Sequence, residues 1–424
     1  MEKRIINGID VNYIPVKKFK HIMIGFCFQS KLDPTTYNER HMLPSLLEQS
    51  NAVYSNIEKL NTQLDMLYGA AFNASVFQRG EMLSTQFFIR IINDKYVPDQ
   101  SNLLEHAFEF LYRIIYQPKT YRGQLTHKSV KEKLIETKEI LKTIRQDKAS
   151  LAYYRFINHI SSEVHPSQFP IESRLGLVTQ ESLTRVYHQL IQEDELKIYV
   201  IGDFDSNRMD RVIASRLSQL LTEDLSVNYR VKLPEESPIG CVEEKADVSI
   251  SRVYLGYKIH IELNDKEEVM MELLNIILGG YSQSKMFKII REDMHLVYYI
   301  YSTYRMENEM FIIHFECEQT DEEKAIAKAK AIVDDFKHGD VLDEELALAK
   351  QLLANNYKSV MDQLSGMFRI NILSDLVMKR PFDTQERIRW VQSITKEELV
   401  EFSKRLAFHI NYCFHKGGEL VDKE

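Results

Sequence analysis

The order of elements expected along this 424-residue chain occurs twice, and this internal correspondence constrains the fold more than any other feature. Leu64–Met82 aligns without a gap against Glu292–Met310, and both segments are predicted as a helix end, a strand, a turn and a second strand. The offset, about 230 residues from position 64 to position 292, indicates a duplicated domain rather than a solenoid. We therefore expect an α+β fold of two similar halves, each a mainly antiparallel sheet covered by helices, facing each other around a cavity.

The boundary between the halves is expected where the periodic pattern stops. Val231–Pro238 contains two prolines and shows neither helical nor strand periodicity, which is typical of a linker. The predicted division is a first half over 1–228, a linker over 229–242 and a second half over 243–424.

Composition excludes several classes of function. The chain is 44% hydrophobic with a net charge of -8, and its basic residues are scattered, which argues against nucleic-acid binding. Its four cysteines are far apart in sequence, which argues against a disulfide framework or a thiolate zinc site. No apolar run approaches the roughly 20 residues that span a bilayer, and the N-terminus does not resemble a signal peptide. We expect a cytoplasmic protein with no membrane segment.

The helix predicted at Met42–Gln49 follows a strand and a turn, and it reads Ser45-x-x-Glu48-Gln49. In this position it resembles the pitrilysin/insulinase-type metalloproteases, which carry His-x-x-Glu-His there. In those proteases the histidines bind zinc and the glutamate activates the bound water. A serine hydroxyl and a glutamine amide are poor zinc ligands, so the resemblance implies a degenerate zinc motif in which only the glutamate is retained.

The third zinc ligand of the family is a glutamate on a later helix, and the resemblance assigns that position to Glu139. Two carboxylates without imidazoles would bind zinc poorly, so no cofactor is expected on this chain. A purely structural interpretation of Glu48 and Glu139, as polar residues on ordinary helix faces, stays open.

The second half carries a stronger resemblance to the same family. It contains Leu278-Gly279-Gly280, then Arg291-Glu292, then Leu296-Val297-Tyr298, in the order of the family's Leu-Gly-Gly, Arg-Glu and Leu-Ala-Tyr motifs. In these proteases the arginine and tyrosine hold the substrate carbonyl and the charge that develops on it, which here implies Arg291 and Tyr298. The alternative is a solvent-facing arginine and a core tyrosine. Because side chains alternate along a strand, Tyr298 and Tyr299 should point to opposite sides.

The resemblance covers essentially the whole chain and implies a catalytically silent subunit of a heterodimeric zinc peptidase. Its partner would be a paralogue that carries His-x-x-Glu-His and the zinc, and the substrate would be a peptide. A homodimer is possible when the chain is isolated. Two alternatives remain open: a non-catalytic scaffold or peptide-binding clamp, and a stand-alone hydrolase with another metal arrangement.

Overall fold

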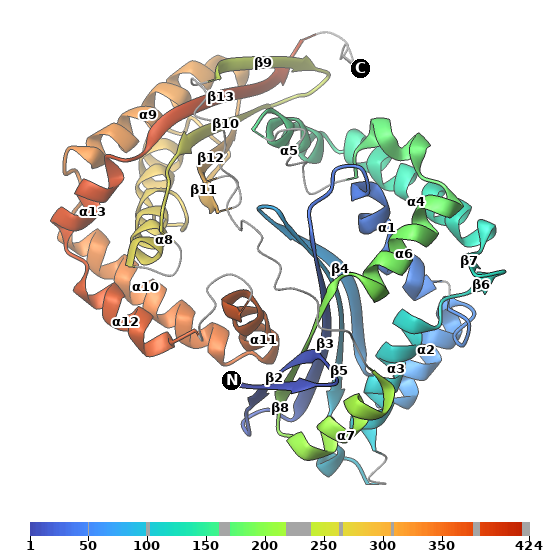
Figure 1. Cartoon of the computed structure of the whole chain (residues 1–424). Coiled ribbons are helices and arrows are strands. Elements are labelled where there is room, and N and C mark those ends of the chain that lie inside the picture. Colours follow the sequence, from blue (N-terminus) through green and yellow to red (C-terminus); the bar gives the residue numbers. More distant parts are fainter. Residues whose placement is uncertain are drawn as a thin grey trace. The chain divides into compact units, whose positions relative to one another are not determined.

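The computed structural model describes residues 1–49, 51–98, 102–160, 170–217, 239–262, 266–306, 309–375 and 382–417. These residues form two compact units. The first unit draws them from Met1–Thr143, Ser161–Tyr229 and Asp362–Pro381, and the second from Ile144–Ile160, Arg230–Met361 and Phe382–Glu424. Each unit combines one large sheet with helices, so the predicted α+β class is confirmed (Figure 1). Within the described residues, no helix is both long and apolar enough to cross a membrane.

The first unit is built on a six-stranded sheet. Its strands follow one another in the order β1 (Glu2–Ile6), β2 (Ile9–Pro15), β8 (Glu195–Gly202), β3 (His21–Lys31), β5 (Met82–Ile92) and β4 (Ala71–Arg79). Neighbouring strands are antiparallel except β2 and β8, which are parallel. Asn7 and Gly8, between β1 and β2, adopt positive φ angles of 48° and 81° and turn the chain into a hairpin.

Helices lie on both faces of this sheet. On one face the ring of Phe108 from α3 (Leu103–Tyr116) lies 5.2 Å from the ring of Phe26. On the other face α11 (Leu364–Leu373) places Phe368 5.1 Å from Phe88. A Cβ atom at Gly25 would come within 2.5 Å of the Phe368 ring, so this close approach requires glycine. The other helices are α1 (Tyr37–Gln49), α2 (Ile57–Met66), α4 (His127–Gln146), α6 (Gln180–Gln192) and α7 (Ser206–Arg216).

The second unit has a five-stranded sheet with the same topology. Its order is β11 (Tyr299–Arg305), β12 (Met310–Cys317), β10 (Ser251–Lys258), β13 (Ala407–Lys416) and β9 (Gly240–Ala246). Only β13 and β9 are parallel, as β8 and β2 are in the first unit. The order β11-β12-β10-β13-β9 therefore repeats β4-β5-β3-β8-β2, and the prediction of two similar, mainly antiparallel sheets is confirmed.

The helices of the second unit also lie on both faces of its sheet. The face with Val253 and Leu255 shares a hydrophobic core with α8 (Lys266–Leu278). The elements that complete this layer are α9 (Glu322–Lys337), α10 (Asp343–Met361), α12 (Thr384–Ser393) and α13 (Lys396–Ser403). The opposite face packs against α5 (Lys148–His159), whose Phe156 ring stacks 4.7 Å from the ring of Tyr254.

The two units do not coincide with the two halves of the sequence. Helix α5 precedes the predicted boundary but belongs to the second unit, and α11 follows the boundary but belongs to the first unit. Most of the predicted linker, residues 229–238, lies outside the described residues. Strand β9 begins at Gly240, inside the predicted linker, because this segment pairs in parallel with β13. The extent of the linker stays a prediction.

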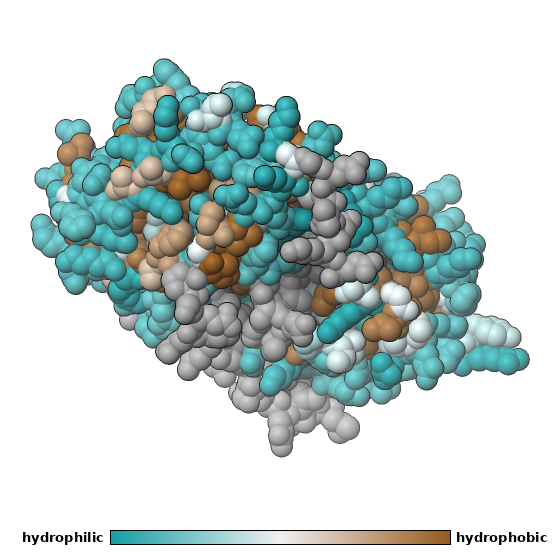
Figure 2. All heavy atoms as spheres, turned by 90° about the horizontal axis from the view of Figure 1, so that it is seen from above, coloured by the Kyte–Doolittle hydropathy of each residue, from teal (hydrophilic) through white to brown (hydrophobic). Residues whose placement is uncertain are grey.

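Large exposed hydrophobic side chains are distributed over several elements. Ile5, Met66 and Leu177 are exposed by 69%, 69% and 72%, and they lie on β1, on α2 and in a short 3-10 helix. On the face in Figure 2, hydrophobic residues are scattered among hydrophilic ones wherever residues are coloured.

Candidate functional site

The degenerate zinc motif lies at the C-terminal end of α1. The Ser45 hydroxyl donates a hydrogen bond to the Met42 carbonyl at 3.3 Å, so its hydrogen is used within its own helix. Glu48 is partly buried, and Gln49 is exposed at the last residue of the helix. Ser45, Glu48 and Gln49 have the spacing of the family motif, but the Ser45 hydroxyl points to the backbone of its own helix.

A lysine from α4 lies near the retained glutamate. The Lys133 side chain is only 6% exposed, and its ammonium group donates to Glu136 at 2.7 Å. Burial raises the pKa of Glu48, the positive charge of Lys133 lowers it, and the negative charge of Glu136 raises it. These three residues form one electrostatic group, which we call the Glu48 cluster.

Glu139, which the resemblance assigns as the third ligand, is exposed on α4. Its carboxylate lies 3.6 Å from the ammonium of Lys142, which is also exposed. Glu136 rather than Glu139 is thus the α4 carboxylate that acts on Glu48. A role for Glu139 in the degenerate motif stays a prediction.

These residues do not fit a zinc ion. The Ser45 hydroxyl is directed to a backbone carbonyl, the Gln49 amide is exposed, and a buried ammonium group lies near the retained carboxylate. Zinc is held by anionic or imidazole donors, and a nearby cation repels it. Within the described residues, no group of three or more His, Cys, Asp and Glu side chains is placed to hold a metal ion.

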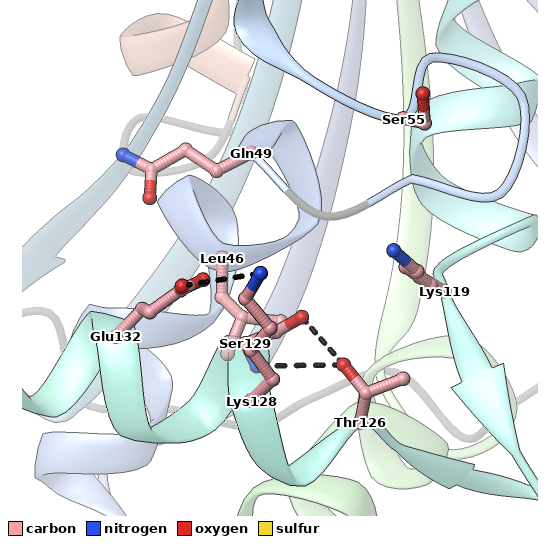
Figure 3. Close-up of a pocket in the computed structure, with 8 residues that line it drawn as sticks. All are labelled: Leu46, Gln49, Ser55, Lys119, Thr126, Lys128, Ser129 and Glu132. Atoms are coloured by element: carbon pink, nitrogen blue, oxygen red, sulfur yellow. Dashed lines mark hydrogen bonds and ion pairs between the residues drawn. The ribbon is translucent and has the colours of Figure 1, made fainter.

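A small pocket of about 260 Å³ adjoins the degenerate motif (Figure 3). Its lining comes from the end of α1, the start of α4 and the connecting segments: Leu46, Gln49, Ser55, Lys119, Thr126, Lys128, Ser129 and Glu132. Glu132 lies 3.8 Å from Lys128, and the Thr126 and Ser129 hydroxyls are 2.6 Å apart. Seven of the eight lining residues are polar, and they are too far apart in sequence for any motif to have predicted the pocket.

Arg291 lies in a short π-helix, η3 (Phe287–Asp293), at the position predicted from the Arg-Glu motif. Its side chain is exposed, and its guanidinium carbon lies 4.6 Å from the centroid of the Phe287 ring. This cation–π contact orients the guanidinium along its own helix. Single π-helical turns often occur at functional sites.

Tyr298 directly precedes β11 and is 54% exposed. Its backbone N–H donates to the Glu316 carbonyl at 2.8 Å, and its phenol donates to the Glu318 carboxylate. This hydrogen bond is the main reason that the pKa of Tyr298 is raised. Arg291 and Tyr298 are therefore both accessible, but each contacts a partner of its own.

The repeated sheets and the degenerate helix motif agree with a fold that resembles the two-unit zinc metalloproteases. Residues 177–353 match the Peptidase M16 inactive domain. Over 417 residues, the chain is 23% identical to the "Probable inactive metalloprotease YmfF" of Bacillus subtilis (strain 168), covering 97% of this chain and 96% of that protein. These matches confirm the resemblance seen in the sequence, to the pitrilysin/insulinase-type metalloproteases and in particular to relatives described as inactive.

Solved structures share the fold over nearly the whole chain. A conserved protein from Enterococcus faecalis V583 superposes with a TM-score of 0.87 at 24% identity, covering 98% of both chains. A protease from Helicobacter pylori superposes with a TM-score of 0.80 at 16% identity, covering 97% of this chain and 98% of that chain. Identities this low show the fold and carry no conclusion about activity.

Proposed function

We propose that this chain is a catalytically silent subunit of a cytoplasmic heterodimeric zinc peptidase. In this proposal, Arg291 and Tyr298 act in the active site of a paralogue that carries His-x-x-Glu-His and the metal. The observation that carries the proposal is a contrast between the halves: both imidazoles of the zinc motif are missing, whereas the arginine and tyrosine are retained at exposed positions.

The chemistry suits stabilisation of a developing negative charge. A guanidinium and a phenol aimed at the oxygen of a substrate carbonyl stabilise the oxyanion, typically by about 3 kcal/mol for each donor. The Tyr298 phenol already donates to a carboxylate, Glu318, which shows that the group is available to an anionic acceptor. In the complex, the substrate oxyanion would replace Glu318 as the acceptor.

The substrate would be a peptide bound as an additional strand. Among the described strands, β4 lies at the edge of the six-stranded sheet and pairs with β5. Such an edge binds extended peptides through main-chain hydrogen bonds. Helix α1, which carries the degenerate motif, packs against β4.

The test is a reconstituted pair of this chain with a His-x-x-Glu-His paralogue, assayed with an unfolded peptide substrate. The double variant Arg291→Ala, Tyr298→Phe should lower kcat about 10²-fold or more, because two transition-state donors are lost. The matched control is Arg389→Ala, Tyr121→Phe, which changes an arginine and a tyrosine that are also exposed. Full peptidase activity of the double variant, with assembly intact by light scattering, would refute the in-trans role.

A non-catalytic scaffold or peptide-binding clamp is the second candidate. It is favoured by the separate partners of the two side chains, Phe287 for Arg291 and Glu318 for Tyr298. The same experiment separates it from the first, since a scaffold predicts normal activity for the double variant and loss of activity only when assembly fails. Metal analysis of the purified chain tests the stand-alone hydrolase, which requires near-stoichiometric zinc. Light scattering of the isolated chain reports whether it forms a homodimer.

A further inference from the structure

A row of aromatic side chains crosses the α5 face of the second sheet. In the strand register, Tyr254 on β10 is opposite His314 on β12, and His314 is opposite Tyr301 on β11. The His314 ring stacks on Tyr254 at 4.3 Å, and the Tyr301 ring meets it edge-on at 5.4 Å. Tyr299, two residues before Tyr301 on the same face, lies 6.3 Å from His314. We call these four residues the aromatic row.

His314 is the polar centre of the aromatic row and is only 8% exposed. Neither of its ring nitrogens has a hydrogen-bond partner among the described residues. Burial and the nearby charge of Arg252 lower its pKa to about 4, so the imidazole is neutral at pH 7. A neutral imidazole has one donor and one acceptor, and leaving both unpaired in a buried position is unfavourable.

The aromatic row is closed at one end and open at the other. Tyr254 is 3% exposed, and α5 covers it with Phe156. Tyr299 is 49% exposed and Tyr301 is half-buried, and both lie on β11, the edge strand of the sheet. Exposed side chains change rotamer readily, so a movement of Tyr299 would open a path from the edge of the sheet toward Tyr301 and His314.

The charges around the aromatic row disfavour a basic occupant. Arg252 lies near His314, and Arg305 donates to the Tyr153 hydroxyl at 2.6 Å on the same side of the sheet. These cations disfavour a basic side chain on the aromatic faces. The nearby carboxylate of Glu316 already accepts a hydrogen bond from Arg252 at 2.9 Å.

We propose that the aromatic row binds the side chain of a tyrosine in a peptide ligand. The ring of the ligand tyrosine would lie against Tyr299 and Tyr301, and the hydroxyl of the ligand tyrosine would form a hydrogen bond with His314. A phenol both donates and accepts, so it can satisfy an imidazole nitrogen that a phenylalanine ring would leave unpaired. This binding goes beyond the in-trans role of Tyr298, because it belongs to the isolated chain and leaves Arg291 and Tyr298 unused.

The test titrates the isolated full chain with N-acetyl-tyrosinamide, and compares N-acetyl-phenylalaninamide and N-acetyl-leucinamide. NMR of chain labelled at histidine follows the His314 ring, identified by the signal that His314→Phe removes. We expect a saturable shift of that signal and about fivefold tighter binding of the tyrosine probe than of the phenylalanine probe, as one added hydrogen bond gives. Equal affinities for the three probes, or no shift of the His314 signal, would overturn the proposal.

Variants assign the binding to the aromatic row. His314→Phe keeps a ring but removes both nitrogens, so it should abolish the preference for tyrosine over phenylalanine. Tyr301→Leu changes a half-buried residue and should weaken binding of the tyrosine probe at least tenfold. This variant keeps the test valid if His314→Phe does not fold. Tyr121→Ala, a 65% exposed position in the first unit, is the control. Binding unchanged in Tyr301→Leu would contradict the proposed site.

Discussion

At the scale of single residues, the degenerate motif differs from a zinc site by more than its two missing histidines. The sequence shows Ser45 and Gln49 in the ligand positions, but it does not show that Lys133 is buried near Glu48. A buried ammonium paired with Glu136 supplies positive charge close to the retained carboxylate. The structural interpretation of Glu48 is thus more specific: its carboxylate belongs to the Glu48 cluster, in which Lys133 is the buried member.

Restoring the histidines alone should therefore not restore zinc binding. We predict that Ser45→His, Gln49→His binds zinc at least tenfold more weakly than the same variant carrying Lys133→Met, because the ammonium repels the ion. Competition with a chromogenic chelator measures both affinities. Lys133→Met in the otherwise unchanged chain is the control for altered packing. Equal zinc affinity with and without Lys133 would show that its charge does not oppose the metal.

At the scale of elements, the helical layer of the second unit contains two glutamates one helical turn apart, of which Glu268 is buried and Glu272 is half-buried. Glu268 of α8 forms an ion pair with Arg387 of α12, and Glu272, one turn along α8, accepts a hydrogen bond from Tyr357 of α10. The pKa of Glu272 is raised to about 7, mainly by burial; the Tyr357 hydrogen bond lowers this pKa and the negative charge of Glu268 raises it. Three helices thus meet at a carboxyl group that is protonated in the folded state at mildly acidic pH.

This arrangement predicts that the stability of the second unit falls as pH rises. The folded pKa of Glu272 lies above the unfolded value, so the folded state holds the proton between about pH 4.5 and 7 while the unfolded state has lost it. Above pH 7 the ionised Glu272 should lower the free energy of unfolding by about 3 kcal/mol relative to its value below pH 4.5. Glu272→Gln should remove this loss, so its advantage in thermal midpoint over wild type should be larger at pH 8 than at pH 5. The same advantage at both pH values would contradict the prediction.

At the scale of the whole molecule, each unit depends on both halves of the sequence. The reason is an exchange of two helices: α5 comes from the first half but belongs to the second unit, and α11 comes from the second half but belongs to the first unit. Helix α11 packs on the first sheet through Phe368 at Gly25, and α5 packs on the second sheet through Phe156 at Tyr254. Neither segment 1–228 nor segment 243–424 contains all the helices of its unit. A buried sheet face without its helix exposes apolar side chains to water.

We therefore predict that 1–228 and 243–424, expressed separately, do not fold, and that they form a stable complex when expressed together. Size-exclusion chromatography and hydrogen exchange of β3 and β10 amides report the outcome, with the intact chain as control. A cooperative, fully protected fold of either segment alone would show that the exchanged helices are dispensable.

The sequence by itself determined the class of fold, the repeat and the loss of the zinc motif. These features depend on local periodicity and on motifs that lie close together in the chain, such as Ser45–Gln49 and Leu278–Tyr298. It missed the Asn7-Gly8 hairpin, although that dipeptide is a known turn signal. It also missed β9, whose position depends on pairing with the distant β13.

Only the tertiary structure decided how distant segments combine. The exchange of α5 and α11, the burial of Lys133 near Glu48 and the alignment of Tyr254, His314 and Tyr301 all join residues that are far apart in sequence. Periodicity identifies which face of a helix or strand is apolar, but it does not specify which partner covers that face. The degenerate zinc motif was thus readable in the sequence, whereas the charge that now lies near it was fixed by packing between two helices.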